Sequence, residues 1–194
     1  MGGKVSVILS TPDLHRPPPL PPGADEIVLI NGYGSVARNE GARLASGSIL
    51  AFMDASVRVT GSFERLHRAP PSEAWWSLHS FRPSDGQDPH LASRCLGASL
   101  CAAVHLPSGS IQPFQAVRRP LFELIGGYHP VKDYARDLAL RLSATGATLY
   151  RVDAIGYLLS DWEGAPKPEE QDEAPLLYRV APAWTAEKAF AATL

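Results

Sequence analysis

Hydrophobic residues fall into separate blocks over the first sixty positions, and each block predicts one element. Three blocks rich in β-branched and aliphatic residues predict buried strands, and the segment between the second and third predicts a short helix. The strands cover residues 4–10, 25–32 and 48–59, and the helix covers 35–47. Strands that are apolar along their whole length are typical of a parallel sheet covered on both faces, so an α/β fold is expected.

The blocks that follow predict a more varied second half. Residues 74–81 and 99–106 predict two strands of an antiparallel addition. Residues 118–130 and 133–146 predict helices, and 148–159 predicts one or two strands. Pro120 is expected to open the first of these helices, and Gly126 with Gly127 to close it.

Proline-rich segments divide the chain. Residues 15–23, "HRPPPLPPG", predict polyproline II or a rigid loop, because proline fits neither a helix interior nor a central strand. An acidic, proline-containing stretch at 163–175 is expected to be an exposed linker. The predicted organisation is therefore a domain over 1–162, that linker, and a segment over 176–194 that packs back on the domain as a helix.

Composition narrows the functional classes. The chain has 194 residues, 45% hydrophobic and 20% charged, with 18 Lys and Arg against 20 Asp and Glu. A net charge of −2 indicates no affinity for nucleic acid. No apolar stretch approaches the roughly 20 residues of a transmembrane helix, and no signal peptide is recognised. We expect a cytoplasmic protein in which Cys95 and Cys101 are buried thiols, with a disulfide as the alternative.

Polar residues stand where the predicted strands end. Thr11 and Asp13 follow the first strand, Asn31 ends the second, and Asp54 interrupts the third. Parallel α/β sheets bind ligands at the carboxyl ends of their strands, so these side chains are candidate site residues. The alternative for Asp54 is a strand-end cap that accepts backbone N–H groups.

Four segments, taken in order, resemble the landmarks of family 2 glycosyltransferases. They are "VSVILST", "VARNEGARLASGSILAFMDASVRV", "AVRRPLFELIGGYHP" and "DLALRLSATG". The resemblance covers about half of the chain. It implies an α/β fold of the GT-A, nucleotide-diphospho-sugar transferase-like type, with a mixed, mainly parallel sheet flanked by helices. It also implies transfer of a sugar from a nucleoside diphosphate sugar to an acceptor that the sequence does not identify.

The resemblance assigns roles to individual residues. Asp54 would hold Mg²⁺ or Mn²⁺, since hard cations prefer oxygen ligands and neutralise a diphosphate. Thr11 and Asp13 would line the base pocket, and Arg38 and Asn39 would face the nucleotide, with the Arg38 guanidinium suited to phosphate. Two further positions carry substitutions relative to the family: Ser56 stands at the second aspartate of its central motif, and Asn31 near the aspartate that ends its second strand.

The base region also departs from the family pattern. Its acidic pair would fall on Tyr134 and Ala135, which leaves Asp133, or alternatively Asp137, to deprotonate the acceptor hydroxyl. Ser160 or Asp161 stands where the family has a metal-binding histidine.

These departures leave three hypotheses open. The first is a trimmed glycosyltransferase. The second is a non-catalytic relative that binds a nucleotide or a protein partner. The third is an interaction module whose proline-rich segment is read by an aromatic groove. The sequence leaves the oligomeric state undetermined.

Overall fold

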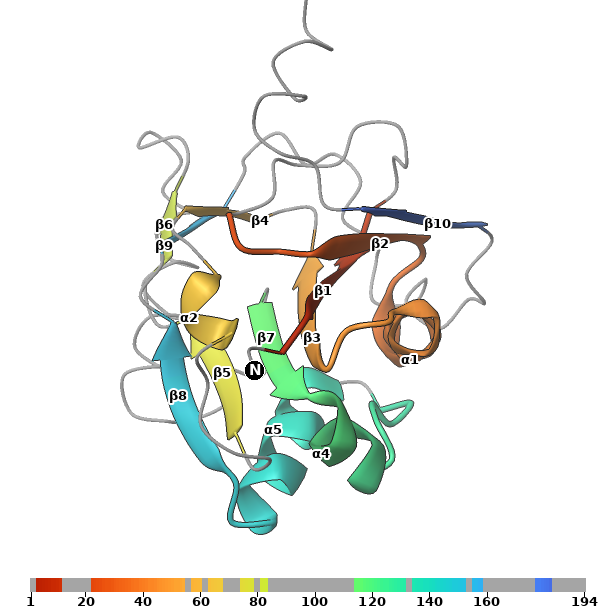
Figure 1. Ribbon diagram of the computed structural model, residues 1–194. Helices are drawn as coiled ribbons and strands as arrows, with labels where there is room; N and C mark the ends of the chain where they lie inside the picture. The colour runs from red at the N-terminus through yellow and green to blue at the C-terminus, as the bar shows by residue number, and fades with distance from the viewer. Residues whose placement is uncertain are drawn as a thin grey trace, which may run out of the picture.

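The computed structural model describes residues 3–11, 22–54, 57–60, 63–67, 74–78, 81–83, 114–131, 134–152, 155–158 and 177–182 (Figure 1). The elements are β1 (Val5–Ser10), β2 (Glu26–Asn31), α1 (Gly34–Leu44), β3 (Ile49–Asp54), β4 (Val57–Thr60), α2 (Glu64–His67), β5 (Ala74–Leu78), β6 (Phe81–Pro83), β7 (Phe114–Arg118), α4 (Arg119–Leu124), α5 (Tyr134–Ala144), β8 (Thr148–Val152), β9 (Ile155–Leu158) and β10 (Leu177–Pro182).

The strands form two sheets. A seven-stranded sheet has the order β10-β2-β1-β3-β7-β5-β8, and a three-stranded sheet has the order β4-β9-β6. In the large sheet β1, β2, β3, β5 and β8 run in one direction, whereas β7 and β10 run in the other. The prediction of a mixed, mainly parallel α/β sheet is therefore confirmed.

The two faces of the large sheet are covered by different elements. Because side chains alternate along a strand, Ile8 and Phe52 lie on the face that carries α1, α4 and α5, while Val7 and Met53 lie on the face toward α2 and β4 (Figure 1). Gly41 lets α1 approach the first face closely, because a Cβ there would collide with the side chains of Ile8 and Ile30. Burial on both sides explains why these strands are apolar throughout.

The structure differs from the sequence prediction in three places. The apolar run 48–59 is not one strand: β3 belongs to the large sheet and β4 to the small one. Strand β7 was not predicted. Residues 177–182 form a strand antiparallel to β2, where a helix was expected. The predicted strand at 99–106, the linker at 163–175 and both cysteines lie outside the described residues.

The predicted ends of α4 are confirmed. Pro120 lies in its first turn, and the Gly126 and Gly127 N–H groups donate to the carbonyls of Glu123 and Phe122. Both glycines have positive φ, of 78° and 70°, which only glycine adopts readily. No helix in the described part of the chain is long and apolar enough to span a membrane.

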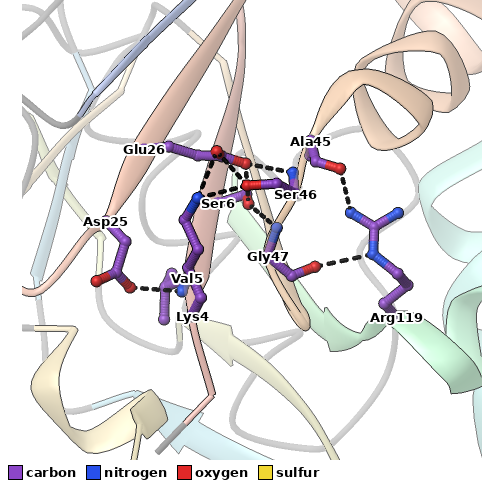
Figure 2. Close-up of polar contacts among 9 residues, drawn as sticks. All are labelled: Lys4, Val5, Ser6, Asp25, Glu26, Ala45, Ser46, Gly47 and Arg119. Carbon is purple, nitrogen blue, oxygen red and sulfur yellow. Dashed lines mark hydrogen bonds and ion pairs between the residues drawn. The ribbon is translucent and has the colours of Figure 1, made fainter.

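A buried carboxylate joins the elements at the amino edge of the sheet. It and its partners form the Glu26 cluster, which consists of Glu26, Lys4, Ser6 and Ser46 (Figure 2). Glu26 accepts hydrogen bonds from Lys4 Nζ at 2.9 Å, Ser6 Oγ at 2.5 Å, and Ser46 Oγ at 2.6 Å. The Ser46 N–H also donates to it at 2.5 Å. The cluster thereby ties the starts of β1 and β2 to the loop that leads into β3.

Arg119 holds the same loop from the other side. Its Nη1 donates to the Ala42 carbonyl at 2.9 Å. Its Nη2 donates to the Ala45 carbonyl at 2.6 Å, and its Nε to the Gly47 carbonyl at 2.8 Å (Figure 2). Two of these carbonyls belong to the C-terminal end of α1, which has no further helical turn to satisfy them. Arg119 therefore caps α1 and connects it to α4.

The Glu26 cluster makes stability depend on pH. Burial raises the pKa of Glu26, but the hydrogen bonds from Ser46, Ser6 and Lys4 outweigh it and lower the pKa from 4.5 to about 2. Because the folded state binds this proton more weakly than the unfolded state, the contribution is complete above about pH 5 and is lost as pH falls toward 2. We expect a loss of up to about 3 kcal/mol in the free energy of unfolding over that range.

Urea denaturation at pH 6, 4.5 and 3 measures this effect. Glu26→Gln should flatten this part of the pH dependence, whereas Glu123→Gln, an exposed position, should leave it unchanged. An equal slope in wild-type protein and Glu26→Gln would contradict the assignment.

Candidate functional site

The candidate site lies at the carboxyl edge of the large sheet, opposite the Glu26 cluster. Asp54 ends β3, and its neighbour in register on β1 is Ser10. Both side chains follow the alternation of Ile8 and Phe52, so they point to the face covered by α1. Asp54 is partly open to solvent, with 25% of its side chain exposed. The sheet thus presents one accessible carboxylate where parallel strands bind ligands.

Arg38 reaches this carboxylate from α1. Its Nη2 donates to Asp54 Oδ1 at 2.5 Å, and only 2% of its side chain is exposed. Burial lowers the pKa of Arg38, but the Asp54 charge and the neighbouring tyrosines raise it well above its ordinary value. The guanidinium is therefore permanently charged, and it acts on the site through Asp54.

Two tyrosine rings, which also contact each other, pack against the guanidinium. It lies 5.4 Å from the ring centre of Tyr128 and 5.2 Å from that of Tyr134, and its Nη1 donates to Tyr128 Oη at 3.3 Å. Tyr128 in turn donates to Gln115 Oε1 at 2.9 Å, and Gln115 Nε2 donates to the Ala135 carbonyl at 3.2 Å. A continuous buried polar chain therefore runs from Asp54 to the first turn of α5.

Asn39 fixes the backbone of Tyr128. Its Nδ2 donates to the Tyr128 carbonyl at 2.8 Å, and the Tyr128 N–H donates to its Oδ1 at 2.9 Å. Gly127 precedes Tyr128, and a Cβ there would come within 2.6 Å of Asn39 Oδ1. The amide of Asn39 thus holds the turn after α4 against α1. This contact connects the "ARN" segment of α1 to the "GGY" segment that follows α4.

Of the other predicted nucleotide-binding residues, the structure describes Thr11 and Asn31, at the ends of β1 and β2. Thr11 is buried, and its N–H donates to the Ile30 carbonyl at 2.9 Å, which keeps β1 and β2 paired at this edge. Asn31 ends β2 and is half-buried. Asp13 and Ser56 lie outside the described residues.

The structure describes one of the two candidate bases, Asp137. Asp133 lies outside the described residues. Asp137 accepts from Arg141 Nε at 2.8 Å and from its Nη2 at 2.7 Å, and it lies 3.3 Å from His129 Nδ1. Arg141 also donates to the carbonyls of Ile125 and Gly127. Asp137 therefore belongs to an ion-pair network that joins α5 to the end of α4, and within the described part of the chain it forms no hydrogen bond or ion pair with Asp54.

Sequence reasoning did not single out Tyr33, Tyr128 or Gln115. Tyr33 precedes α1; burial raises the pKa of its phenol, and the negative charge of Asp54 raises it further, so Tyr33 stays neutral beside the site. Gln115 is 1% exposed within β7. The signal that the sequence does contain is a polar residue in an apolar run. Tyr128 carries no such signal.

The residues present fit a divalent cation only in part. Asp54 uses Oδ1 for Arg38, which leaves Oδ2 as a hard oxygen ligand. The described residues contain no group of three His, Cys, Asp or Glu side chains placed to hold a metal. A single carboxylate does suit Mg²⁺ or Mn²⁺ when phosphate oxygens supply further ligands.

Three buried polar atoms on β1 and α1 have no hydrogen-bond partner among the described residues. They are Ser10 Oγ on β1, and Ser35 Oγ and Arg38 Nε on α1. Buried polar groups are nearly always satisfied, so these atoms are places where an enclosed water molecule would supply the missing bond.

Comparison with known proteins supports the architecture. The sequence matches no family model, and no curated protein is significantly similar to it. The structure is similar to that of a mannosyltransferase from Pyrobaculum calidifontis in complex with GDP-Man and Mn²⁺, with a TM-score of 0.51 at 15% identity, covering 84% of this chain and 59% of the mannosyltransferase.

Two structures of Drosophila β1,4-galactosyltransferase 7 also match, one with manganese, UDP-Gal and xylobiose and one with xylobiose. Their TM-scores are 0.48, at 11% and 13% identity, and each match covers 77% of this chain and 65% of the other. This chain therefore spans less than two thirds of the length of each of these proteins. At such identities the likeness concerns the fold alone, and the fold is that of GT-A-type glycosyltransferases.

Proposed function

We propose that this chain is a glycosyltransferase of the family 2 type that transfers a sugar from a nucleoside diphosphate sugar to an acceptor. The observation that carries the proposal is the placement of Asp54, partly exposed, at the carboxyl edge of a GT-A-type sheet. The similar mannosyltransferase was solved with GDP-Man and Mn²⁺, which supports a nucleotide-sugar donor and a divalent cation.

In this proposal each residue has a defined task. Asp54 offers Oδ2 to a Mg²⁺ or Mn²⁺ ion, which would neutralise the diphosphate and stabilise the leaving nucleotide. Arg38 orients Asp54 by its bond to Oδ1. Asn39 holds Tyr128 against Arg38 and so supports the same carboxylate indirectly. The remaining proposed contacts to the nucleotide come from Thr11, Asp13, Asn31 and Ser56.

Proton removal from the acceptor hydroxyl is assigned to Asp133 or Asp137. Asp137 can serve only if its bonds to Arg141 are rearranged, since the carboxylate is bound by that guanidinium at 2.8 and 2.7 Å. This observation favours a second candidate function, a GT-A-type domain that binds a nucleotide without transfer. Binding without turnover of the sugar nucleotide would identify it.

Calorimetric titration with UDP, GDP and dTDP, in Mn²⁺ and in EDTA, tests the proposal. Binding of one nucleotide that is stronger in Mn²⁺ is the expected result. No binding of any of the three under either condition would overturn the glycosyltransferase assignment.

Replacing the carboxylate sharpens this test. Asp54→Asn removes the charge that the cation needs, so we expect nucleotide affinity in Mn²⁺ to fall by about tenfold or more. Asp25→Asn is the matched control, because Asp25 accepts a bond from the Val5 N–H at the opposite edge of the sheet. Equal affinities of Asp54→Asn and wild-type protein would exclude Asp54 as the metal ligand.

A further inference from the structure

Arg38 is fixed beside Asp54 from several directions. The Nη2–Oδ1 distance is 2.5 Å, the guanidinium lies against the rings of both Tyr128 and Tyr134, and Nη1 donates to Tyr128 Oη at 3.3 Å. Asn39, the next residue of α1, clamps the Tyr128 backbone at 2.8 and 2.9 Å. Moving the guanidinium away would leave a permanent charge buried and unpaired, which is costly.

The charge of Asp54 is consequently already neutralised inside the protein. A divalent cation bound to Oδ2 alone would face the positive guanidinium across the same carboxylate. Arg38 is 1% exposed, so water screens this repulsion poorly. Proteins that hold such cations without a substrate gather several carboxylates, and the described residues contain no group of that kind.

A nucleoside diphosphate reverses this balance. Its phosphates bring negative charge and hard oxygen ligands, and a cation bound to them needs only one further carboxylate oxygen. We propose that the free protein does not retain Mn²⁺ or Mg²⁺ at Asp54 and instead binds the cation together with the nucleoside diphosphate, because Arg38 acts as the resident counter-ion of this carboxylate. The inference rests on the proposed function and adds the order of binding.

Electron paramagnetic resonance of free Mn²⁺ tests the order directly. Wild-type protein without nucleotide should leave the Mn²⁺ signal unchanged, which corresponds to a Kd above about 1 mM. Addition of the nucleotide identified by calorimetry should make the signal fall, and it should not fall with Asp54→Asn. Retention of Mn²⁺ by the wild-type protein alone, at a site that Asp54→Asn removes, would overturn the inference while leaving the proposed function intact.

Arg38 variants then identify the cause. Arg38→Met removes the resident charge, so Asp54 should bind Mn²⁺ without nucleotide at least about tenfold more tightly than in the wild type. Arg38→Lys keeps a positive charge and should behave like the wild type. A folded Arg38→Met protein with no gain in Mn²⁺ binding would contradict the proposal. If that variant does not fold, the wild-type titrations decide the question alone. If no nucleotide binds, the proposed function fails and the inference with it.

Discussion

Arg38→Met is expected to lower the free energy of unfolding by about 3–5 kcal/mol, the largest effect of any single change considered for this chain. The substitution removes one partner of a buried ion pair and leaves the other in place. Asp54 regains some hydration because 25% of its side chain is exposed, which places the expected loss nearer the lower value. Tyr128 keeps its bond to Gln115, so the remainder of the polar chain persists.

Urea denaturation gives the measurement, and α1 supplies its own control. Arg43 lies on the same helix with 68% of its side chain exposed and pairs with Glu40. Arg43→Met should change the free energy of unfolding by less than about 0.5 kcal/mol. If the two substitutions cost the same, the ion pair between Arg38 and Asp54 does not contribute as the structure indicates.

Arg119→Ala is expected to cost about 3 kcal/mol, the second-largest effect. The side chain makes three charge-assisted bonds to carbonyls, each worth about 1–1.5 kcal/mol net, and water recovers part of the loss because 23% of the side chain is exposed. The end of α1 and the loop around Gly47 then lose their common support.

Arg119→Lys separates geometry from charge. An ammonium group is compact and cannot match three carbonyls with the planar fork of arginine, so we expect recovery of about a third of the loss. Thermal or urea unfolding of both variants provides the comparison. Full recovery by lysine would show that the charge at the end of α1 matters and that the three separate bonds do not.

Local patterns in the sequence predict most of the central sheet. Residues 5–10, 26–30 and 49–53 are buried on both faces, so an unbroken apolar run was sufficient to find β1, β2 and β3. The ends of α4 depend on proline and paired glycines, which act within a few residues. Such features need no knowledge of distant contacts.

The site depends on contacts that no local pattern contains. A helix arginine between alanine and asparagine has the appearance of a solvated residue, yet Arg38 is buried because its partners lie 16 residues away at Asp54 and 90 residues away at Tyr128. The family resemblance placed Arg38 and Asn39 toward the nucleotide. The structure shows both Nη groups of Arg38 and the amide of Asn39 bonded to protein, and their proposed influence on a ligand is indirect.

Strand β7 was missed for a related reason. Gln115 interrupts its apolar run, and the strand ends at a pair of arginines, so its composition resembles a helix start more than a strand. Only the bonds of Gln115 to Tyr128 and to the Ala135 carbonyl explain a glutamine at a buried position. These partners are distant in the sequence, so a prediction based on hydrophobic alternation does not find β7.

The division of one apolar run between β3 and β4 gives Asp54 an unusual neighbourhood. The chain leaves the large sheet after Asp54 and enters the small sheet at Val57. Asp54 therefore lies at one of several points where consecutive strands belong to different sheets; β5 to β6 and β8 to β9 are others. Because only two residues separate Asp54 from β4, a displacement of the small sheet would move the end of β3 that carries the carboxylate.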